Sequence, residues 1–524
     1  MTYPRLTLVR SALVASLVAV CTSLHAQVAL QPKSMPRVAQ VDPRYVSFNV
    51  EAIEITGGRF WKPFPKKDQP PAVPGTTTDP YQYRPPIDLS RTKLRKLASA
   101  LAPSYMRVSG TWRNSTYFQN DDALQMSTPP TGFKGVMTRA QWKGAIDFAH
   151  AVGADLVTSV AISDGTRDAN GDWTTTQAKA FFDFTRKAGG HIAATEFLNE
   201  PTFAAQGAAP KGYDEVAFAK DVKAFRTFLK AESPDTIHLG PGSIGEGVPM
   251  IVGMPMPKML STEKMLQASG PVFDAFSYHV YTTLSPRCVG KMGLSWEKVL
   301  TPAYLDRNPD TEAFYAKLRN TYLPGKQIWL TETGEAGCGG SPWASSFIDT
   351  FRFADQLGSL ARRNVQTVMV NTLASSDYGL LNEETLNPRP DYWLALLWKR
   401  LMGTTVLDPG PAPDATLRIY AHCMKDAPSG VSVVALNIDK DADHAITLPA
   451  AERYTLTAPE LLSETMMLNG KPLQAGEDGT LPAIAGERTK AGEQKLPPAS
   501  ITFFTMRNAG NAACPESSAH SPAR

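Results

Sequence analysis

Between about residues 45 and 400, short apolar runs rich in β-branched and aromatic residues alternate with longer amphipathic stretches. This alternation is typical of repeated strand–helix units that build a parallel sheet. Eight strands are predicted, over Tyr45–Glu51, Tyr105–Ser109, Asp155–Ile162, Ala194–Leu198, Thr236–Gly240, Phe273–His279, Gln327–Glu332 and Gln366–Asn371. Helices are predicted over Ser90–Leu101, Arg139–Val152, Thr176–Lys187, Tyr213–Ala231, Thr311–Tyr322 and Ser345–Arg363. Eight such units favour an α/β fold, a (β/α)8 TIM barrel, and an open doubly wound sheet is the alternative.

The pattern changes after about residue 402, where alternating runs are separated by Asp, Gly and Pro turns and long helical stretches are scarce. The clearest runs are Leu417–Cys423, Val431–Ile438 and Ser500–Met506, which predict a C-terminal all-β sandwich. We therefore expect a catalytic barrel over residues 45–401 and a sandwich over 402–514. The N-terminal segment 27–44 is expected to become part of the sandwich. The tail 515–524 is rich in Ser, Ala and Pro and is expected to be disordered.

The first 26 residues have the pattern of a signal peptide. Arg5 and Arg10 precede the apolar run Ser11–Leu24, and the small residue Ala26 marks a cleavage position. An N-terminal anchor helix is the alternative, but the apolar run is shorter than the roughly 20 residues that a bilayer requires. No later segment is long and apolar enough to span a membrane. We expect an exported protein, periplasmic or secreted, that is a monomer.

Composition and charge narrow the function classes. Hydrophobic residues make up 43% of the 524 residues and charged residues 20%, as in a soluble globular protein. The formal net charge is 53 − 50 = +3, and removal of the two leader arginines leaves +1. Binding to nucleic acid or to an anionic membrane surface rests on an excess of basic charge, so neither is expected.

Four cysteines remain after the leader is removed: Cys288, Cys338, Cys423 and Cys514. An even number in an exported chain predicts two disulfides, and four cysteines allow three pairings. The first two follow predicted strands and the last two bracket the C-terminal region, which favours Cys288 with Cys338 and Cys423 with Cys514. No cysteine or histidine spacing resembles a zinc site, so neither a metal nor an organic cofactor is expected.

Two predicted strands lead into glutamates. Strand four runs into Asn199-Glu200-Pro201, and strand seven ends in Glu332. A barrel places both at its C-terminal mouth, where a pair of carboxyl groups can cleave a glycosidic bond. One must stay protonated to release the leaving oxygen, and the other must stay ionised. Glu335 competes with Glu332, but the apolar run places Glu332 at the rim and Glu335 in the following loop.

The residues around these glutamates resemble glycoside hydrolase family 79, the heparanase and β-glucuronidase family. The resemblance covers nearly the whole mature chain and is most specific over Trp329–Leu407. The motifs that carry it are Met106–Thr111, Asn199–Pro201, Tyr278–Tyr281, Ser376–Gly379, Pro390–Trp393, Gly403–Leu407 and Arg507–Ala509. Cys423 and Cys514 match the family's sandwich disulfide, and Glu335 aligns with a position that is not acidic in heparanase-like sequences.

The resemblance implies a retaining double displacement. Glu200 would be the general acid/base and Glu332 the nucleophile, with carboxyl groups about 5 to 5.5 Å apart. The residues implied to bind sugar hydroxyls are Asn199, Glu51 and, more weakly, Thr111. Those implied to orient the nucleophile are Arg107, Tyr281 and His279. For Arg107 and Glu51 the alternative is a structural ion pair inside the barrel.

A uronic acid carboxylate would be held by a clamp that the resemblance assigns to Gly339, Gly340 and Tyr378. The glycines would offer backbone N–H groups and the tyrosine its hydroxyl. Cys338 stands where the family has a glycine, so a bridge to Cys288 can reposition one amide. The long first loop, Gly57–Pro86, is expected to wall the sugar subsites with aromatic rings or to form a packed lid. Four basic residues are candidates for lining an acidic-sugar cleft: Lys134, Arg139, Lys143 and Arg287.

We therefore predict a single-chain retaining β-glucuronidase of the heparanase type. Its partner would be a glucuronic-acid-containing oligo- or polysaccharide, or a glucuronide conjugate. Strong heparan sulfate binding is not expected, because Gly247–Met265 holds only Lys258 and Lys264 where animal heparanase has basic clusters. One alternative is a neutral-sugar glycosidase of the same clan, a xylosidase or arabinofuranosidase. The other is a non-catalytic glycan-binding protein.

Overall fold

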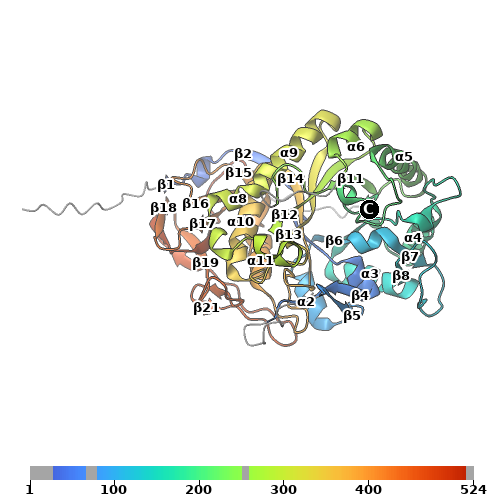
Figure 1. Cartoon of the computed structure of the whole chain (residues 1–524). Coiled ribbons are helices and arrows are strands. Elements are labelled where there is room, and N and C mark those ends of the chain that lie inside the picture. The colour runs from blue at the N-terminus through green and yellow to red at the C-terminus, as the bar shows by residue number, and fades with distance from the viewer. Residues whose placement is uncertain (1–27, 66–78, 251–258, 515–524) are drawn as a thin grey trace, which may run out of the picture.

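Eight parallel strands close into a barrel in the order β10–β11–β12–β13–β14–β3–β6–β9 (Figure 1). This computed structural model describes residues 28–65, 79–250 and 259–514, so the predicted signal peptide (1–26) and tail (515–524) lie outside the described residues. The barrel strands are β3 (Val46–Asn49), β6 (Ser104–Val108), β9 (Ala154–Thr158), β10 (Ile192–Glu196), β11 (Ile237–Ser243), β12 (Ala275–Leu284), β13 (Gln327–Gly337) and β14 (Val365–Val370). All eight match predicted runs, and the closed order confirms the barrel and excludes the doubly wound sheet.

Helices cover the outside of the barrel. They are α1 (Ala52–Thr56), α2 (Thr92–Ser99), α3 (Arg139–Val152), α4 (Thr176–Lys187), α5 (Glu215–Glu232), α6 (Thr262–Ser269), α7 (Pro286–Val289), α8 (Pro302–Leu305), α9 (Arg307–Tyr322), α10 (Phe347–Arg362) and α11 (Pro390–Leu401). Helix α3 shows why helices could be predicted from the sequence, because residues that favour a helix start and a helix end stand at its bounds. Thr138 and Gln141 form a capping box at its start, and Gly153 ends it in the left-handed conformation.

Short elements decorate the loops of the barrel. Two small two-stranded sheets are the antiparallel pair β4 (Gly58–Trp61) with β5 (Tyr81–Arg84) and the parallel pair β7 (Thr116–Gln119) with β8 (Gly135–Thr138). Short 3-10 turns are η1 (Pro32–Ser34), η2 (Thr111–Ser115), η3 (Asp164–Thr166), η4 (Pro201–Phe203), η5 (Gly290–Met292) and η6 (Trp296–Lys298). The pair β4–β5 belongs to the long first loop and reaches over the barrel mouth.

The C-terminal strands form an all-β sandwich beside the barrel, as predicted (Figure 1). One sheet has the order β2–β15–β16–β17–β24–β19–β20–β21, with β22 on β19, and the other has the order β1–β18–β23. The strands are β1 (Val28–Ala29), β2 (Arg37–Gln40), β15 (Met402–Leu407), β16 (Leu417–Met424), β17 (Val431–Asn437), β18 (His444–Leu448), β19 (Ala451–Thr457), β20 (Met467–Leu468), β21 (Lys471–Pro472), β22 (Glu487–Thr489), β23 (Gly492–Leu496) and β24 (Ser500–Met506).

The large sheet is buried on both faces. On β17, Val431 and Val433 face the core between the two sheets, whereas Val434 and Leu436 face the barrel. Helix α10 lies in the contact between the barrel and β16 and is buried on almost all sides. A strand covered on both faces reads as a continuous apolar run, which is how β17 appears in the sequence.

Strand β13 is longer than the sequence pattern indicated. Its eleven residues continue past Glu332 to Gly337, so the expectation that Glu335 lies in a flexible loop is wrong. The glycines that suggested a loop instead admit side chains of β12: a Cβ at Gly334 would lie 2.9 Å from Tyr281, and one at Gly337 3.0 Å from Leu284. Among the described residues, no helix is long and apolar enough to cross a membrane.

Candidate active site

A cavity of about 900 Å³ opens at the C-terminal mouth of the barrel. Sequence-predicted site residues that line it are Glu51, Thr111, Glu200, Tyr281, Glu332 and Tyr378. Asn199, Arg107 and His279 lie behind this surface, each at most 2% exposed. The cavity has the place and size of a small-molecule or glycan site on this fold.

Glu200 follows strand β10 in a strained backbone conformation. Its φ of 52° is left-handed, and Pro201 begins the 3-10 turn η4 directly after it. Such a conformation costs about 1–3 kcal/mol and is typical of residues held for function. Its Oε1 lies 3.1 Å from Nδ1 of His279. Burial raises the pKa of Glu200; the hydrogen bond with His279 lowers it and the charge of Glu332 raises it, and the net rise favours a carboxyl that stays protonated.

Glu332 lies within β13, and two hydrogen-bond donors from the strands β6 and β12 hold its carboxylate. Arg107 donates from Nη1 to Oε2 at 2.7 Å, and the Tyr281 hydroxyl donates to Oε1 at 2.7 Å. The side chain is nearly buried, yet both oxygens accept charge-stabilising hydrogen bonds. These contacts suit a carboxylate that remains ionised and in one orientation.

One oxygen of Glu200, one oxygen of Glu332 and one ring nitrogen of His279 all lie within 4.8 Å of one another. A short separation between two carboxyl groups is typical of retaining rather than inverting glycosidases. The same three groups could offer ligands to a cation. Burial lowers the pKa of His279, but the charge of Glu332 and the hydrogen bonds to Glu196 and Glu200 outweigh this effect and raise the pKa to about 9. A protonated imidazole cannot bind a cation.

His279 lies closer to Glu200 than to Glu332. Its Nδ1 is 3.1 Å from Glu200 but 3.8 Å from Glu332, and its Nε2 lies 3.2 Å from Nη2 of Arg107. The imidazole therefore touches both members of the carboxyl pair and the arginine that holds one of them. The resemblance implies that His279 orients Glu332, but its shorter contact is with Glu200.

Glu196 is a site residue that the sequence analysis missed. It ends strand β10, is fully buried, and accepts from Arg107 at 2.8 and 3.1 Å. Its other oxygen accepts from the hydroxyls of Ser277 and Thr331 at 2.8 and 2.7 Å. These contacts overcome the effect of burial and depress the pKa of Glu196 well below its usual range. The available signal was a lone acid inside a predicted barrel strand.

Asn371, at the end of strand β14, is a second residue that was missed. Its side-chain amide donates to Glu51 at 3.1 Å, to the Tyr281 hydroxyl at 2.9 Å and to the Tyr378 hydroxyl at 3.3 Å. One amide thereby connects the loop after β3, strand β12 and the loop after β14. It fixes three of the predicted site residues relative to one another.

Glu51 caps helix α1 and projects into the cavity. Its backbone N–H donates to Glu54 in a capping box at 2.9 Å. Burial, and next the charge of Glu332, raise the pKa of Glu51 well above its usual range. Gly110 leaves the space for this carboxyl, because a Cβ there would lie 1.5 Å from Oε2 of Glu51. Glu51 accepts from Asn371 and has no ion-pair partner among the described residues, whereas Arg107 does form a buried ion pair inside the barrel, with Glu196, besides its contact with Glu332.

Asn199 is fixed by the loop that also contains Thr111. Asn114 accepts from the backbone N–H of Asn199 at 2.8 Å and donates to its carbonyl oxygen at 2.9 Å. The Asn199 side-chain oxygen accepts from Nη2 of Arg107 at 2.8 Å. Thr111 starts η2 and lines the cavity.

The predicted carboxylate clamp is only partly open to the cavity. Tyr378 lines it, but Gly339 and Gly340 do not. The N–H of Gly340 donates to the carbonyl of Ala336 at 3.2 Å. Glu335, the rejected nucleophile candidate, is fully buried and accepts from the N–H of Ser341 at 2.8 Å.

Both predicted disulfides are present in the structure. Cys288 is bonded to Cys338, and Cys423 to Cys514. The first bridge lines the cavity, and the second closes the sandwich next to β16. Disulfides are typical of proteins outside the reducing cytosol.

Aromatic rings wall one side of the cavity. Trp61 of β4 lies 4.7 Å from Tyr81 of β5 and 6.4 Å from Trp112, measured between ring centroids. The first loop therefore contributes directly to the cavity. Of the four basic candidates, Lys134 lines the cavity, whereas Arg139 and Lys143 pair with acids on the surface.

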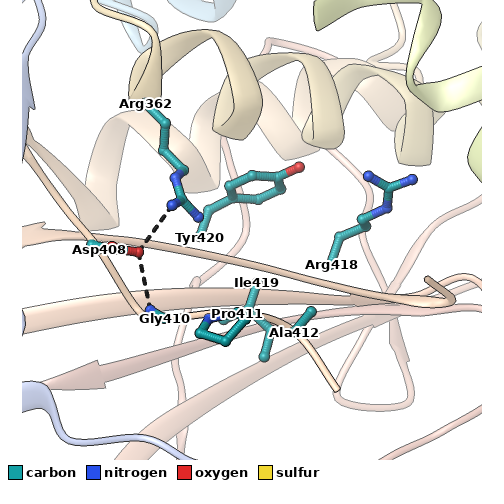
Figure 2. Close-up of a pocket in the computed structure, with 8 residues that line it drawn as sticks. All are labelled: Arg362, Asp408, Gly410, Pro411, Ala412, Arg418, Ile419 and Tyr420. Carbon is teal, nitrogen blue, oxygen red and sulfur yellow. Dashed lines mark hydrogen bonds and ion pairs between the residues drawn. The ribbon is translucent and has the colours of Figure 1, made fainter. Parts of the chain in front are cut away.

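A second, smaller hollow of about 350 Å³ lies where α10 meets β16 (Figure 2). Arg362 pairs with Asp408 at 2.9 Å, and Tyr420 donates to the buried Asp355 at 2.6 Å. Figure 2 shows Arg362 and Arg418 on opposite sides of the Tyr420 ring. These contacts join the barrel to the sandwich and are remote from the strand ends.

A family model described as glycosyl hydrolase family 79, N-terminal domain, matches residues 86–358, just over half of the chain. The chain belongs to glycosyl hydrolase family 79. This match includes β6, β10, β12 and β13, the strands that position the carboxyl pair and its supporting residues. Membership of the family and the barrel fold make the protein a retaining glycoside hydrolase.

Family 79 relatives are similar over most of their length. "Heparanase-like protein 1" of Arabidopsis thaliana is 26% identical over 492 residues, which cover 82% of this chain and 86% of that protein. "Heparanase" of Bos taurus is 27% identical over 534 residues, which cover 90% of each. A solved 4-O-α-L-rhamnosyl-β-D-glucuronidase from Fusarium oxysporum superposes with a TM-score of 0.60 at 15% identity, covering 92% of this chain and 99% of that one. The last likeness is one of fold.

Proposed function

We propose that this protein is an exported retaining β-glucuronidase in which Glu200 is the general acid/base and Glu332 the nucleophile. The observation that carries the proposal is the carboxyl pair in a family 79 barrel, with oxygens of the two groups within 4.8 Å across the cavity. The protein supplies the two protonation states that the reaction requires. Burial raises the pKa of Glu200, and Arg107 and Tyr281 stabilise charge on Glu332.

In the first step, an oxygen of Glu332 attacks the anomeric carbon while Glu200 gives its proton to the leaving oxygen. The glycosidic bond breaks and a glycosyl ester forms on Glu332. In the second step, Glu200 takes a proton from water, whose oxygen attacks the anomeric carbon and releases Glu332. Asn199, Glu51 and Thr111 are proposed to hold sugar hydroxyls during both steps. Asn199 would do so by turning its amide group toward the cavity, while Arg107 holds its oxygen.

Glucuronic acid is the proposed sugar because Tyr378 offers a neutral hydrogen-bond donor to the cavity. Tyr378 lines the cavity, and burial holds the pKa of its hydroxyl well above its usual range, so that it remains a donor. The Cys338–Gly340 turn lies directly behind it, where a Cβ at Gly340 would be 3.3 Å from the Tyr378 ring. The names of the heparanase relatives agree with a uronic acid substrate. The oligosaccharide or conjugate would enter past Trp61 and Trp112.

The proposal is tested by release of the phenol from aryl β-glucuronides, β-glucosides and β-xylosides. We expect turnover of the glucuronide alone. Glu332→Gln should abolish it with any leaving group, whereas Glu200→Gln should cost roughly 10²–10⁴-fold with phenyl glucuronide and less with the better leaving group 4-nitrophenol. Glu312→Gln, at a buried glutamate on α9 away from the cavity, is the matched control and should retain activity.

Each contrary result has a distinct meaning. Turnover of the xyloside or glucoside in place of the glucuronide would make the protein a neutral-sugar glycosidase. Tight binding of glucuronic-acid oligosaccharides without any turnover would make it a glycan-binding protein. Equal loss for the two leaving groups in Glu200→Gln would contradict the acid role of Glu200.

A further inference from the structure

Arg287 lies behind the cavity and gathers the carbonyl groups of one turn. It belongs to the short helix α7 and is 7% exposed in its side chain. From Nη1 it donates to the carbonyl oxygens of Gly339 and Gly340 at 2.8 Å each, and of Cys338 at 3.3 Å. All three peptide groups of the Cys338–Gly340 turn therefore have their oxygens on the same side.

The same guanidinium connects this turn to two other loops of the mouth. Its Nη2 donates to the carbonyl of Lys62 at 2.6 Å and pairs with Asp377, the neighbour of Tyr378. Its carbon lies 3.8 Å above the centre of the Phe64 ring. Arg287 thus holds together loops that follow the first, sixth, seventh and eighth strands of the barrel.

The direction of the carbonyls fixes the direction of the amides. In a planar trans peptide the C=O and N–H groups point opposite ways, so the N–H groups of the turn face away from Arg287. Those of Gly340 and Ser341 donate to Ala336 and Glu335. No described residue accepts from the N–H of Gly339. Cys338, whose carbonyl shares this peptide group, lines the cavity although Gly339 itself does not, so this free donor lies at the edge of the cavity.

The turn is strained at the position where this chain departs from its family. Cys338 has a φ of 66°, followed by Gly339 at 81° and Gly340 at 86°. A left-handed conformation is unfavourable for a residue other than glycine. The turn keeps this shape between two restraints that both come from α7: the hydrogen bonds of Arg287 and the disulfide of its neighbour Cys288.

Tyr378 supplies a second donor beside this turn. Its hydroxyl accepts from the amide of Asn371 at 3.3 Å, and no described residue accepts its proton. Its ring packs on Gly340, and its neighbour Asp377 is the ion-pair partner of Arg287. One buried arginine therefore positions both donors.

We infer that Arg287 is a positioning residue for the sugar carboxylate: it sets the turn so that the Gly339 N–H and the Tyr378 hydroxyl face the cavity together. The guanidinium itself does not line the cavity, and its charge is balanced by Asp377. It would act through the backbone rather than by contact with the substrate. This inference rests on the proposed glucuronidase function.

The test compares two inhibitors of glucuronide hydrolysis, glucuronate and glucuronamide, which differ in the charge at the sugar's sixth carbon. The wild type should bind glucuronate more tightly. Arg287→Met should reduce this preference by roughly tenfold or more, the range for a lost hydrogen bond to a charged group, and should raise KM more than it lowers kcat. Arg287→Lys keeps the charge beside Asp377 but cannot span three carbonyls, so it should lose the preference too. If Arg287→Met does not fold, Arg287→Lys replaces it as the test variant.

Two controls separate this role from general stability. Arg418→Met removes a less deeply buried arginine, paired with Asp306 at 2.9 Å and lining the hollow of Figure 2, and should keep the preference. The double variant Cys288→Ser/Cys338→Gly removes the bridge, restores a glycine and should keep the preference as well. If the double variant loses it while Arg287→Met keeps it, the disulfide holds the turn and the inference is overturned.

The inference and the proposed function fail in different ways. If the wild type hydrolyses the glucuronide but Arg287→Met weakens both inhibitors equally, the inference fails and the function stands. If the wild type does not hydrolyse the glucuronide, the function fails and the inference with it.

Discussion

The guanidinium of Arg107 donates to Glu196 through both Nε and Nη2, at 3.1 and 2.8 Å, and both side chains are at most 1% exposed. This pairing leaves Nη1 directed at Glu332, 2.7 Å away. The orientation of the proposed nucleophile therefore depends on a carboxylate that does not touch the cavity.

Replacing Glu196 with Gln tests this dependence. The change removes the buried counter-charge of Arg107 and should lower the free energy of unfolding by about 3–5 kcal/mol, as breaking a buried ion pair does. It should also lower kcat/KM, because Arg107 can turn away from Glu332. Glu232→Gln breaks the exposed pair with Lys179 and should lower the free energy of unfolding far less, because solvent screens that pair. Denaturant titrations of both variants give the comparison; equal costs would contradict the prediction.

Gly110 should be essential for the position of Glu51. In Gly110→Ala the new Cβ would lie 1.5 Å from Oε2 of Glu51, so the carboxyl must leave its place. We expect kcat/KM to fall by at least about tenfold, the effect of losing one good hydrogen bond to the substrate. Gly189→Ala is a matched control, because Gly189 has a similar left-handed φ but no atom within 4 Å of its Cβ position. Equal kinetic losses in the two variants would show that backbone strain alone is responsible.

His279 should set the alkaline limit of activity. Its pKa is raised to about 9, so it is positively charged at neutral pH and stabilises the ionised form of Glu200, 3.1 Å away. His279→Gln removes this charge, and the pKa of Glu200 should rise. The alkaline limb of the kcat/KM profile should move up by about one pH unit. His238→Gln, at a buried histidine whose pKa is lowered to about 3 mainly by burial, should leave the limb in place. A downward shift in His279→Gln would contradict the assignment.

Glu335 should make the stability depend on pH. Burial raises its pKa from 4.5 to about 8, so the folded state binds the proton more tightly than the unfolded state. Stability from this group is therefore present below about pH 4.5 and is lost as pH rises toward about 8. Glu335→Gln removes the titration, and its free energy of unfolding relative to the wild type should be more favourable at pH 8 than at pH 5. Urea titrations at both values check this; a constant difference would contradict it.

The barrel could be predicted because each strand repeats a local pattern. Runs such as Gln366–Asn371 have an apolar, β-branched centre at Val368–Val370, and α3 carries its own start and stop signals. The carboxyl pair could be predicted for the same reason, since Glu200 and Glu332 stand at the ends of such runs. The place of a residue at the end of a strand can be read from its neighbours in the sequence alone.

The supporting contacts could not be predicted in this way. Glu196 and Asn371 act through partners that are distant in sequence, and the sequence shows neither which acid faces Arg107 nor which amide bridges three loops. The end of β13 was misjudged for a related reason: Gly334 and Gly337 look like loop residues until the side chains of β12 that occupy their space are known. Tertiary packing decides these positions.

The sandwich draws on both ends of the described chain. Strand β1 pairs with β18, β2 pairs with β15, and Asn511 donates to the carbonyl groups of Pro32 and Met35. During synthesis, β1 and β2 therefore stay without their partner strands until the whole barrel has been made. The sandwich closes last, when Cys514 emerges and can meet Cys423. A nascent chain of this topology must keep its leading edge strands from pairing with other chains until its final residues arrive.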